Sequence, residues 1–318
     1  MGGGRLRASY KKSAATGHFL ATCQISDIFA PGSSLLDNSI AGGVTIPLST
    51  TPLRSVDGNL LLEALDAADR ALLAPHAERR VVERGDVLFR AGDDVSHVTF
   101  PVHGCVVTLV VPLMDGKSVE TATVGREGAI GGVVSQGYLP AFGQAVVQVG
   151  GPVIRIDAER LAEAKQASNA VRDLFVRYAD CLLAQVLQSV ACNAAHTIER
   201  RCLRWLLTLQ DRLGTPDLPV THEVLADMLG VRRAYLTEVL GRLRREGLIE
   251  IGHKRLTLPD RARAEAAACE CHAAVRHHFS EVLGAVYASS GRIIAVDATE
   301  PDRLKPPSAA VTLRELAP

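Results

Sequence analysis

The chain has 318 residues, of which 47% are hydrophobic, and its 35 basic and 35 acidic side chains give a formal net charge of zero. This length is enough for two domains with cores of their own. No apolar run approaches the roughly 18 to 20 residues that cross a bilayer, and the first residues, MGGGRLRASYKK, lack the apolar core of a signal peptide. We therefore expect a cytoplasmic protein with no membrane partner.

Residues 1–56 are rich in Gly, Ser, Thr and Pro and show little periodicity, which predicts a disordered extension. Its basic first dozen residues fit a targeting peptide, a DNA-touching arm or no specific role. We expect ordered structure to begin near Asp57, where leucines follow at helical spacing until Pro75 closes the segment.

From Arg79 to Asp157 the pattern changes to short β-rich runs separated by turns, among them GCVVTLVV, SVETATV, QAVVQV and PVIRI. Short strands at this spacing predict a small antiparallel barrel or jelly roll. Between two of the runs, Asp115 and Gly116 predict a hairpin turn, since glycine tolerates positive φ.

Residues 169–195 predict one long helix, with apolar residues at a spacing that approximates a narrow heptad seam. The seam comprises Val171, Leu174, Tyr178, Cys181 or Leu182, Val186 and Val190. Such a helix standing off a barrel is typical of a dimer coiled coil, and the alternative is a helix packed on its own barrel. Thr197 then caps a second helix with an apolar stripe around Trp205, which we expect to support the next unit.

The stretch from Val220 to Leu258 has the pattern of a winged helix-turn-helix. Thr221 is a good N-cap for a first helix, and Gly230 ends that helix in a conformation that lets a second helix leave at a steep angle. The second helix, from about Arg232 to Glu246, has apolar residues on one face only. Two short strands around Gly252-His253-Lys254-Arg255 complete the pattern as a wing.

The charges of this stretch fit a DNA-binding role. Between Met228 and Leu258, seven Lys or Arg side chains stand against three Glu, a net +4 in a chain that is neutral overall. A local positive excess on the element that enters a groove is what phosphate neutralisation requires. The alternative is an ordinary two-helix corner with a solvated basic face.

After the wing, Pro259-Asp260 predicts a further helix that runs through RARAEAAACECHAAVRHHF. Cys269, Cys271 and His272, with His277 and His278, suggest a metal site. On one helix, however, Cys269 and Cys271 point in different directions, so we expect no metal. Residues 289–318, with Pro301, Pro306 and Pro307, predict a disordered tail.

The seven cysteines are never spaced as CxxC, and in a reducing cytoplasm such residues are most often buried thiols. They are Cys23, Cys105, Cys181, Cys192, Cys202, Cys269 and Cys271.

The order of barrel, long helix and winged helix-turn-helix resembles the Crp/Fnr family of bacterial transcription regulators over roughly residues 57–280. The resemblance is carried by the sequences RGDVLFRAGD, GREGAIG at the place of the family's phosphate-binding cassette, and THEVLADMLGVRRAYLTEVLGRLRREGLI. It implies an α+β fold with an N-terminal antiparallel β-barrel of the jelly-roll type as a cyclic-nucleotide-binding-like sensor (57–168). A long dimerisation helix (169–195) and a C-terminal winged helix-turn-helix (196–280) follow.

By the same resemblance we expect a homodimer on double-stranded DNA with a two-fold symmetric operator, and an unidentified effector in the barrel. RNA polymerase is a further candidate partner. The residues of the effector pocket would be Arg126, Gly128, Ala129, Ile130 and Gln144.

Departures from the family pattern argue against its known cofactors. Family members that bind cyclic nucleotides have a Glu after the cassette glycine and an Arg further on, whereas this chain has Ala129 and the segment from Phe142 to Gln144. Burying a phosphate without a cationic partner costs several kcal/mol, so we expect weak or absent cyclic AMP binding. Only Cys23 precedes the barrel, so we expect no iron-sulfur cluster, and lone histidines do not predict haem.

The DNA contacts can be assigned by position. Arginine at the entry of a recognition helix reaches base edges, most often those of guanine. The predicted base contacts are Arg232, Arg233, Thr237 and Glu238. The predicted phosphate contacts, which position without specifying, are Thr221, Tyr235, Arg242, Lys254 and Arg255.

Two other functions compete with a transcription regulator. A catalytic, metal-binding jelly roll would need clustered histidines and carboxylates, and His97 and His103 have no such company in the sequence. The intact turn and the basic face argue against the other alternative, a ligand-binding or dimer-interaction module with a degenerate DNA-binding head, and a salt-dependent gel shift on promoter DNA would decide between them. The sequence therefore favours a regulator over an enzyme.

Overall fold

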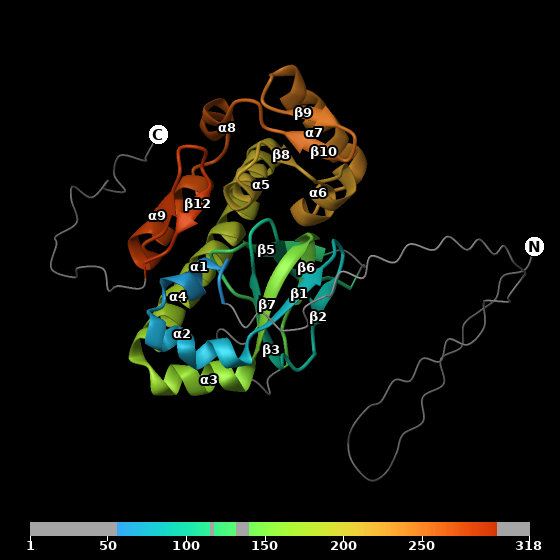
Figure 1. Cartoon of the computed structure of the whole chain (residues 1–318). Coiled ribbons are helices and arrows are strands. Elements are labelled where there is room, and N and C mark those ends of the chain that lie inside the picture. The colour runs from blue at the N-terminus through green and yellow to red at the C-terminus, as the bar shows by residue number, and fades with distance from the viewer. Residues whose placement is uncertain (1–55, 115–117, 132–139, 298–318) are drawn as a thin grey trace, which may run out of the picture. The chain divides into compact units, whose positions relative to one another are not determined.

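The computed structural model describes residues 56–114, 118–131 and 140–297 (Figure 1). The predicted extension up to residue 55, the Asp115-Gly116 turn and residues 298–318 of the predicted tail lie outside these ranges. Within the described part of the chain, no helix is both long enough and apolar enough to pass through a bilayer.

Two short helices and a 3-10 turn open the described chain, in place of one continuous helix. They are α1 (Leu60–Ala64), α2 (Ala67–Leu73) and η1 (Ala74–His76). The buried side chain of Asn59 caps α1 through its Oδ1 and donates from Nδ2 to the carbonyl oxygens of Pro101 and Gly128, at 2.9 and 2.8 Å. This cap therefore also attaches α1 to the loops of the β domain.

The predicted β-rich region forms two antiparallel sheets, in the described residues ordered β1-β7-β3 and β2-β6-β4-β5. The strands are β1 (Glu78–Val82), β2 (Val87–Phe89), β3 (His97–Pro101), β4 (Val106–Pro112), β5 (Ser118–Val124), β6 (Gln144–Val149) and β7 (Gly151–Asp157). Val107, Val124 and Val147 from one sheet and Val153 from the other share a buried core. The prediction of an antiparallel β domain is confirmed.

Helices α3 (Ala158–Ala167) and α4 (Asn169–Ala195) follow β7, and α4 spans the residues predicted for the long helix. Ser168 caps α4 by accepting from the N–H of Val171 at 3.2 Å. Two side chains attach the helix to the β domain: the Tyr178 hydroxyl donates to the Ala129 carbonyl at 2.9 Å, and Gln185 hydrogen-bonds both backbone groups of Thr123.

The predicted dimer seam of α4 is wrong for its first half. Val171, Leu174, Tyr178 and Cys181 are fully buried in a core shared with α1, β3, β7 and α9. The exposed apolar stripe lies on another face and comprises Val176, Leu183, Leu187 and Val190, which are 55 to 64% exposed. The helix is apolar on two faces, and its periodicity alone did not indicate which of them meets the β domain.

The winged helix-turn-helix has the predicted elements and one more strand. It comprises α5 (Ile198–Leu213), β8 (Asp217–Leu218), α6 (His222–Leu229), α7 (Arg233–Arg245), β9 (Glu250–Gly252) and β10 (Arg255–Thr257). Strand β10 pairs with both β9 and β8, so that the wing is tied to the chain that precedes α6. We missed β8 because two residues give no alternating pattern.

The region after the wing differs from the prediction. In place of one helix there are two, α8 (Arg261–Ala267) and α9 (Cys271–Leu283), and Cys269 lies in the break between them. A hairpin of β11 (Val286–Tyr287) and β12 (Ile293–Ala295) then extends into the region predicted as a disordered tail. Helix α9 packs on α4, and β12 contacts α1. This burial orders the segment.

The DNA-binding unit shares a core with the β domain. Val106 and Val110 of β4 are buried together with the apolar faces of α5, α6 and α7. At the same contact, Arg84 donates to the Pro219 carbonyl at 3.1 Å, and Gln148 lies 3.6 Å from the sulfur of Met228. The two parts are therefore joined by packing as well as by the α4–α5 connection.

Candidate nucleic-acid interface

The helix-turn-helix corner is built from a cap, a left-handed glycine and a buried seam. The Thr221 hydroxyl accepts from the N–H of Val224 at 3.3 Å and so begins α6. Gly230 ends α6 with φ of 68°, a conformation that costs side-chain-bearing residues free energy. The N–H of Val231 then bonds back to the Ala226 carbonyl at 3.0 Å. These contacts fix the direction in which α7 leaves.

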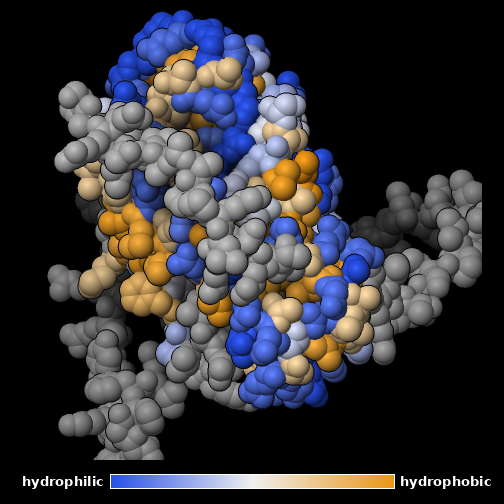
Figure 2. Space-filling view, turned by 90° about the vertical axis from the view of Figure 1, so that its left-hand side faces the viewer, coloured by the Kyte–Doolittle hydropathy of each residue, from blue (hydrophilic) through white to orange (hydrophobic). Residues whose placement is uncertain are grey.

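Helix α7 buries one face and exposes the other. Leu236, Val239, Leu240 and Leu243 are at most 2% exposed and pack against α5 and α6. The predicted base-contact residues all lie on the exposed side, namely Arg232, Arg233, Thr237 and Glu238. In Figure 2 hydrophilic residues cover the upper end of the view, where Figure 1 places α7 and the wing. The arginines that we expect to reach bases therefore do not point into protein.

The predicted phosphate-contact residues are in three different situations. Tyr235, Lys254 and Arg255 are exposed, the last two on the wing. Thr221 is used as the α6 cap, while the half-exposed Arg242 forms an ion pair with Glu199 of α5. An arginine paired in this way would have to exchange a carboxylate for a phosphate, so Arg242 is less available than the wing residues.

A polar groove runs between the start of α6, the start of α7 and the wing. Its lining includes Arg233, Lys254 and Arg255, together with His222 and Glu223. Partial burial and the positive charge of Arg233 lower the pKa of His222, and its Nδ1 lies 3.4 Å from the Thr237 hydroxyl. We missed His222 and Glu223, although their place after the Thr221 cap, at the positive end of a helix, was a usable signal.

The Thr237 hydroxyl donates its hydrogen bond within its own helix. Its Oγ1 donates to the Arg233 carbonyl at 3.0 Å, a bond that threonine commonly makes in helices. Only the acceptor capacity of this hydroxyl remains for a base. Thr237 is therefore a weaker predicted base contact than Arg233.

The predicted effector-pocket residues are attached to different elements. Gly128 and Ala129 use their carbonyl oxygens to accept from Asn59 and Tyr178, and Ile130 forms a bridge with Thr99 of β3. Arg126 lies 3.9 Å from Glu63 of α1. The last of these residues, Gln144, begins β6 beside Val110.

Gly128 is required by close packing. A Cβ at this position would lie 2.3 Å from the Tyr178 hydroxyl, closer than any real contact. The cassette and α4 therefore fit together only because residue 128 has no side chain.

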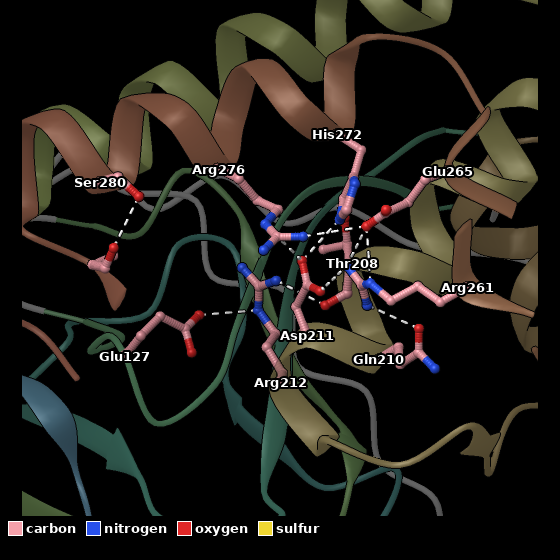
Figure 3. A network of polar contacts seen from close by, with 11 residues as sticks. Glu127, Thr208, Gln210, Asp211, Arg212, Arg261, Glu265, His272, Arg276 and Ser280 are labelled. Atoms are coloured by element: carbon pink, nitrogen blue, oxygen red, sulfur yellow. Dashed lines mark hydrogen bonds and ion pairs between the residues drawn. The ribbon is translucent and has the colours of Figure 1, made fainter. Parts of the chain in front are cut away.

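A buried polar network, which we did not predict, connects the cassette to the DNA-binding unit (Figure 3). Glu127 of the cassette pairs with Arg212 of α5 at 3.0 Å, and both side chains are nearly fully buried. The adjacent Asp211 accepts from Arg261 of α8 at 2.6 Å and contacts His272 of α9 at 2.8 Å. The network thus joins the cassette, α5 and the two helices after the wing.

These features define a class: a winged-helix DNA-binding protein whose reading head is attached to an antiparallel β domain. A family model described as the Crp-like helix-turn-helix domain matches residues 200–266. The global nitrogen regulators of Nostoc sp. (strain PCC 7120) and Synechococcus elongatus are 25% and 26% identical to this chain, over 55% of it and 82% and 83% of their own lengths.

Solved structures share the fold. FixK2 from Bradyrhizobium japonicum aligns with a TM-score of 0.54 and 17% identity over 61% of this chain and 98% of its own. The c-di-GMP responsive global regulator CLP of Xanthomonas campestris aligns with a TM-score of 0.51 and 21% identity, over 61% and 99%.

The chain carries a Crp-like helix-turn-helix domain, and its fold is that of Crp/Fnr-family transcription regulators. It is a DNA-binding regulator and not an enzyme. This confirms the prediction of a DNA-binding transcription regulator.

Proposed function

We propose that the regulator binds a two-fold symmetric operator as a homodimer, with α7 of each subunit in a major groove. The observation that carries this proposal is the exposed basic face of α7, with Arg232 and Arg233 at its entry. Lys254 and Arg255 on the wing line the same protein groove as Arg233. This supports contacts of the wing with phosphates next to the bases that Arg233 would read.

The dimer contact is assigned to the exposed stripe of α4. Val176, Leu183, Leu187 and Val190 are spaced by seven, four and three residues, which is the repeat of a coiled-coil seam. Exposed aliphatic side chains in such a row bury apolar area when two copies of α4 meet. This stripe keeps Val190 of the seam that we predicted from the sequence and replaces its buried members.

Genome-wide mapping of bound sites followed by footprinting tests the proposal. We expect inverted repeats whose half-sites lie one helical turn, roughly 34 to 36 Å, or a multiple of it apart. In fluorescence anisotropy, affinity for such a site should fall steeply with salt because phosphate contacts release counterions. A single asymmetric half-site, or binding indifferent to sequence, would contradict the dimeric operator.

We further propose that an effector other than cyclic AMP acts at the cassette. Support comes from the contacts that the cassette makes to both functional helices, Ala129 to α4 and Glu127 to α5. The predicted pocket residues are those around this loop, Arg126, Gly128, Ala129, Ile130 and Gln144. Calorimetry with cyclic AMP should give no sub-micromolar binding.

Three partner and cofactor predictions complete the proposal. The regulator works without haem and without an N-terminal iron-sulfur cluster, so the purified protein should be colourless. RNA polymerase is a proposed partner of the DNA-bound form. Transcription in vitro from a mapped promoter, with and without the protein, tests this partner and gives the sign of regulation.

A further inference from the structure

Four side chains with metal-binding atoms meet beside the connection between α4 and α5. Cys192 lies in the last turn of α4, and His196 is the C-cap of that helix. Cys269 lies in the break between α8 and α9, and Cys271 is the first residue of α9. The break removes the objection that we raised from the sequence, because the two cysteines are not on one helix.

The donor atoms of these residues fit around one ion. One atom from each of the four side chains lies within 4.8 Å of the other three. The Cys192 and Cys269 sulfurs are 3.5 Å apart, as are the Cys271 sulfur and the His196 Nδ1. In a tetrahedral zinc site with Zn–S bonds of about 2.3 Å, neighbouring sulfurs are about 3.8 Å apart. Small adjustments would therefore complete the coordination.

Two of the four candidate ligands, His196 and Cys271, have the hydrogen-bond partners that metal ligands usually have. The Nε2 of His196 lies 3.1 Å from the Glu270 carboxylate, which leaves Nδ1 directed at the sulfurs. A carboxylate on the far nitrogen of a ligating histidine fixes its tautomer and orientation. Gln188 donates to the Cys271 sulfur at 3.1 Å, a contact that suits a thiolate.

Two arginines lie near the cysteine thiols and would balance the negative charge of the thiolates. Burial lowers the pKa of Arg201, and the neighbouring Cys192 and Cys269 oppose this effect, which places the guanidinium close to both sulfurs. Arg204, nearly buried on the same helix, also interacts electrostatically with Cys192. Three thiolates around a divalent cation leave one negative charge, which these arginines would balance.

The other buried cysteines of the described residues are in a different environment. Burial raises the pKa of Cys105, Cys181 and Cys202 to about 12, and these three behave as small apolar residues in cores. The buried cluster of Cys192, Cys269 and Cys271 contains sulfur side chains alone. Ordinary packing explains the first group but gives no reason for three thiols and an imidazole to converge.

We propose that Cys192, His196, Cys269 and Cys271 bind a single Zn²⁺ ion. Each cysteine thiol gives up its proton to solvent and binds as thiolate, and His196 binds through Nδ1. The ion ties the end of α4 to the α8–α9 break and so fixes the connection on which the DNA-binding unit is carried. This site does not depend on the proposed homodimer or operator.

Metal analysis of the full chain tests the proposal. Protein purified without added chelator should contain about one zinc per chain, as a closed four-ligand site requires. After zinc removal by a chelator, Co²⁺ should restore an occupied site, seen as thiolate-to-cobalt charge-transfer bands and intense tetrahedral d–d bands. These two measurements use the wild-type chain, so they decide the question even where a variant fails to fold.

Variants locate the site. Cys269→Ser and Cys271→Ser should each lower the zinc content, and the intensity of the cobalt charge-transfer bands should fall by the same fraction. Cys181→Ala removes a buried thiol from the same helix as Cys192 but outside the cluster, and should keep the full metal content. Wild-type protein without zinc and without a cobalt spectrum would overturn the proposal. So would mass spectrometry showing Cys192 and Cys269 joined in a disulfide in the metal-free purified chain.

Discussion

Arg233 is the residue in which exposure, charge and position coincide. It is the first residue of α7 and lines the groove shared with the wing. An arginine there can donate two parallel hydrogen bonds to one guanine, a geometry that lysine does not reproduce. Arg233→Ala should therefore weaken binding to the mapped operator by about 1 to 3 kcal/mol and relax the preference at one base pair.

Anisotropy titrations against a set of single-base operator variants measure this effect. Arg245→Ala is the matched control, since Arg245 is exposed in the last turn of the same helix. It should weaken all sequences alike, if at all. An equal loss on every sequence for Arg233→Ala would assign Arg233 to the DNA backbone.

The ion pair of Glu127 with Arg212 is a second single-residue test, this time of stability. Arg212→Met leaves the Glu127 carboxylate buried and without its partner. Removing one member of a buried pair typically costs about 3 to 5 kcal/mol, and we expect a loss of this size in the free energy of unfolding by urea.

The control for this variant is the solvent-exposed pair of Arg160 and Glu163 on α3. Arg160→Met should leave the urea midpoint nearly unchanged, because water and salt screen such pairs. If both variants had the same free energy of unfolding, the Glu127–Arg212 ion pair would not contribute to stability.

At the scale of elements, the turn between α6 and α7 depends on Gly230. Its φ is 68°, and a Cβ there would meet nothing closer than Val119 at 3.5 Å, so the cost of a side chain lies in the backbone. Gly230→Ala should lower the free energy of unfolding by about 1 to 2 kcal/mol and also weaken DNA binding.

Gly241 provides the opposite expectation within the neighbouring helix. It lies inside α7 with helical backbone, and an added Cβ would meet only the Arg245 guanidinium, at 3.7 Å. Gly241→Ala should therefore stabilise the protein by up to about 1 kcal/mol. Thermal unfolding of the two variants side by side checks both signs.

Local patterns predicted these elements well and their long-range contacts poorly. Caps and turn residues placed α6 and α7 to within a residue, because the relevant interactions are between near neighbours in sequence. The face of α4 that meets the β domain, and the pairing of Glu127 with Arg212, depend on segments far apart in the chain. The α8–α9 break was missed because Ala-rich sequence on both sides continues a helical pattern.

At the scale of the whole molecule, the exposed stripe of α4 should decide the oligomeric state. Leu187→Glu puts a charge in the middle of the proposed seam, where Leu187 is 60% exposed in the single chain. Sedimentation velocity should show a shift from dimer to monomer, with the circular dichroism spectrum of the fold retained. Leu72→Glu, an exposed leucine of α2, is the control and should leave the dimer intact.

A monomeric Leu187→Glu variant should also lose most of its operator affinity, because the two heads then bind independently. If Leu187→Glu remained dimeric, the contact between subunits would lie on another surface. The DNA result alone would then not distinguish a damaged head from a lost partner, so sedimentation comes first.

The packing of Val106 and Val110 of β4 among the helices of the reading head bears on how such regulators exchange parts. A chimaera joined at the α4–α5 junction would transfer a DNA-binding unit whose apolar surface is complementary to β4. On a different sensor domain, that unit would expose an apolar patch to solvent and would tend to aggregate. Here evolution has to alter the strand and the head as a matched set.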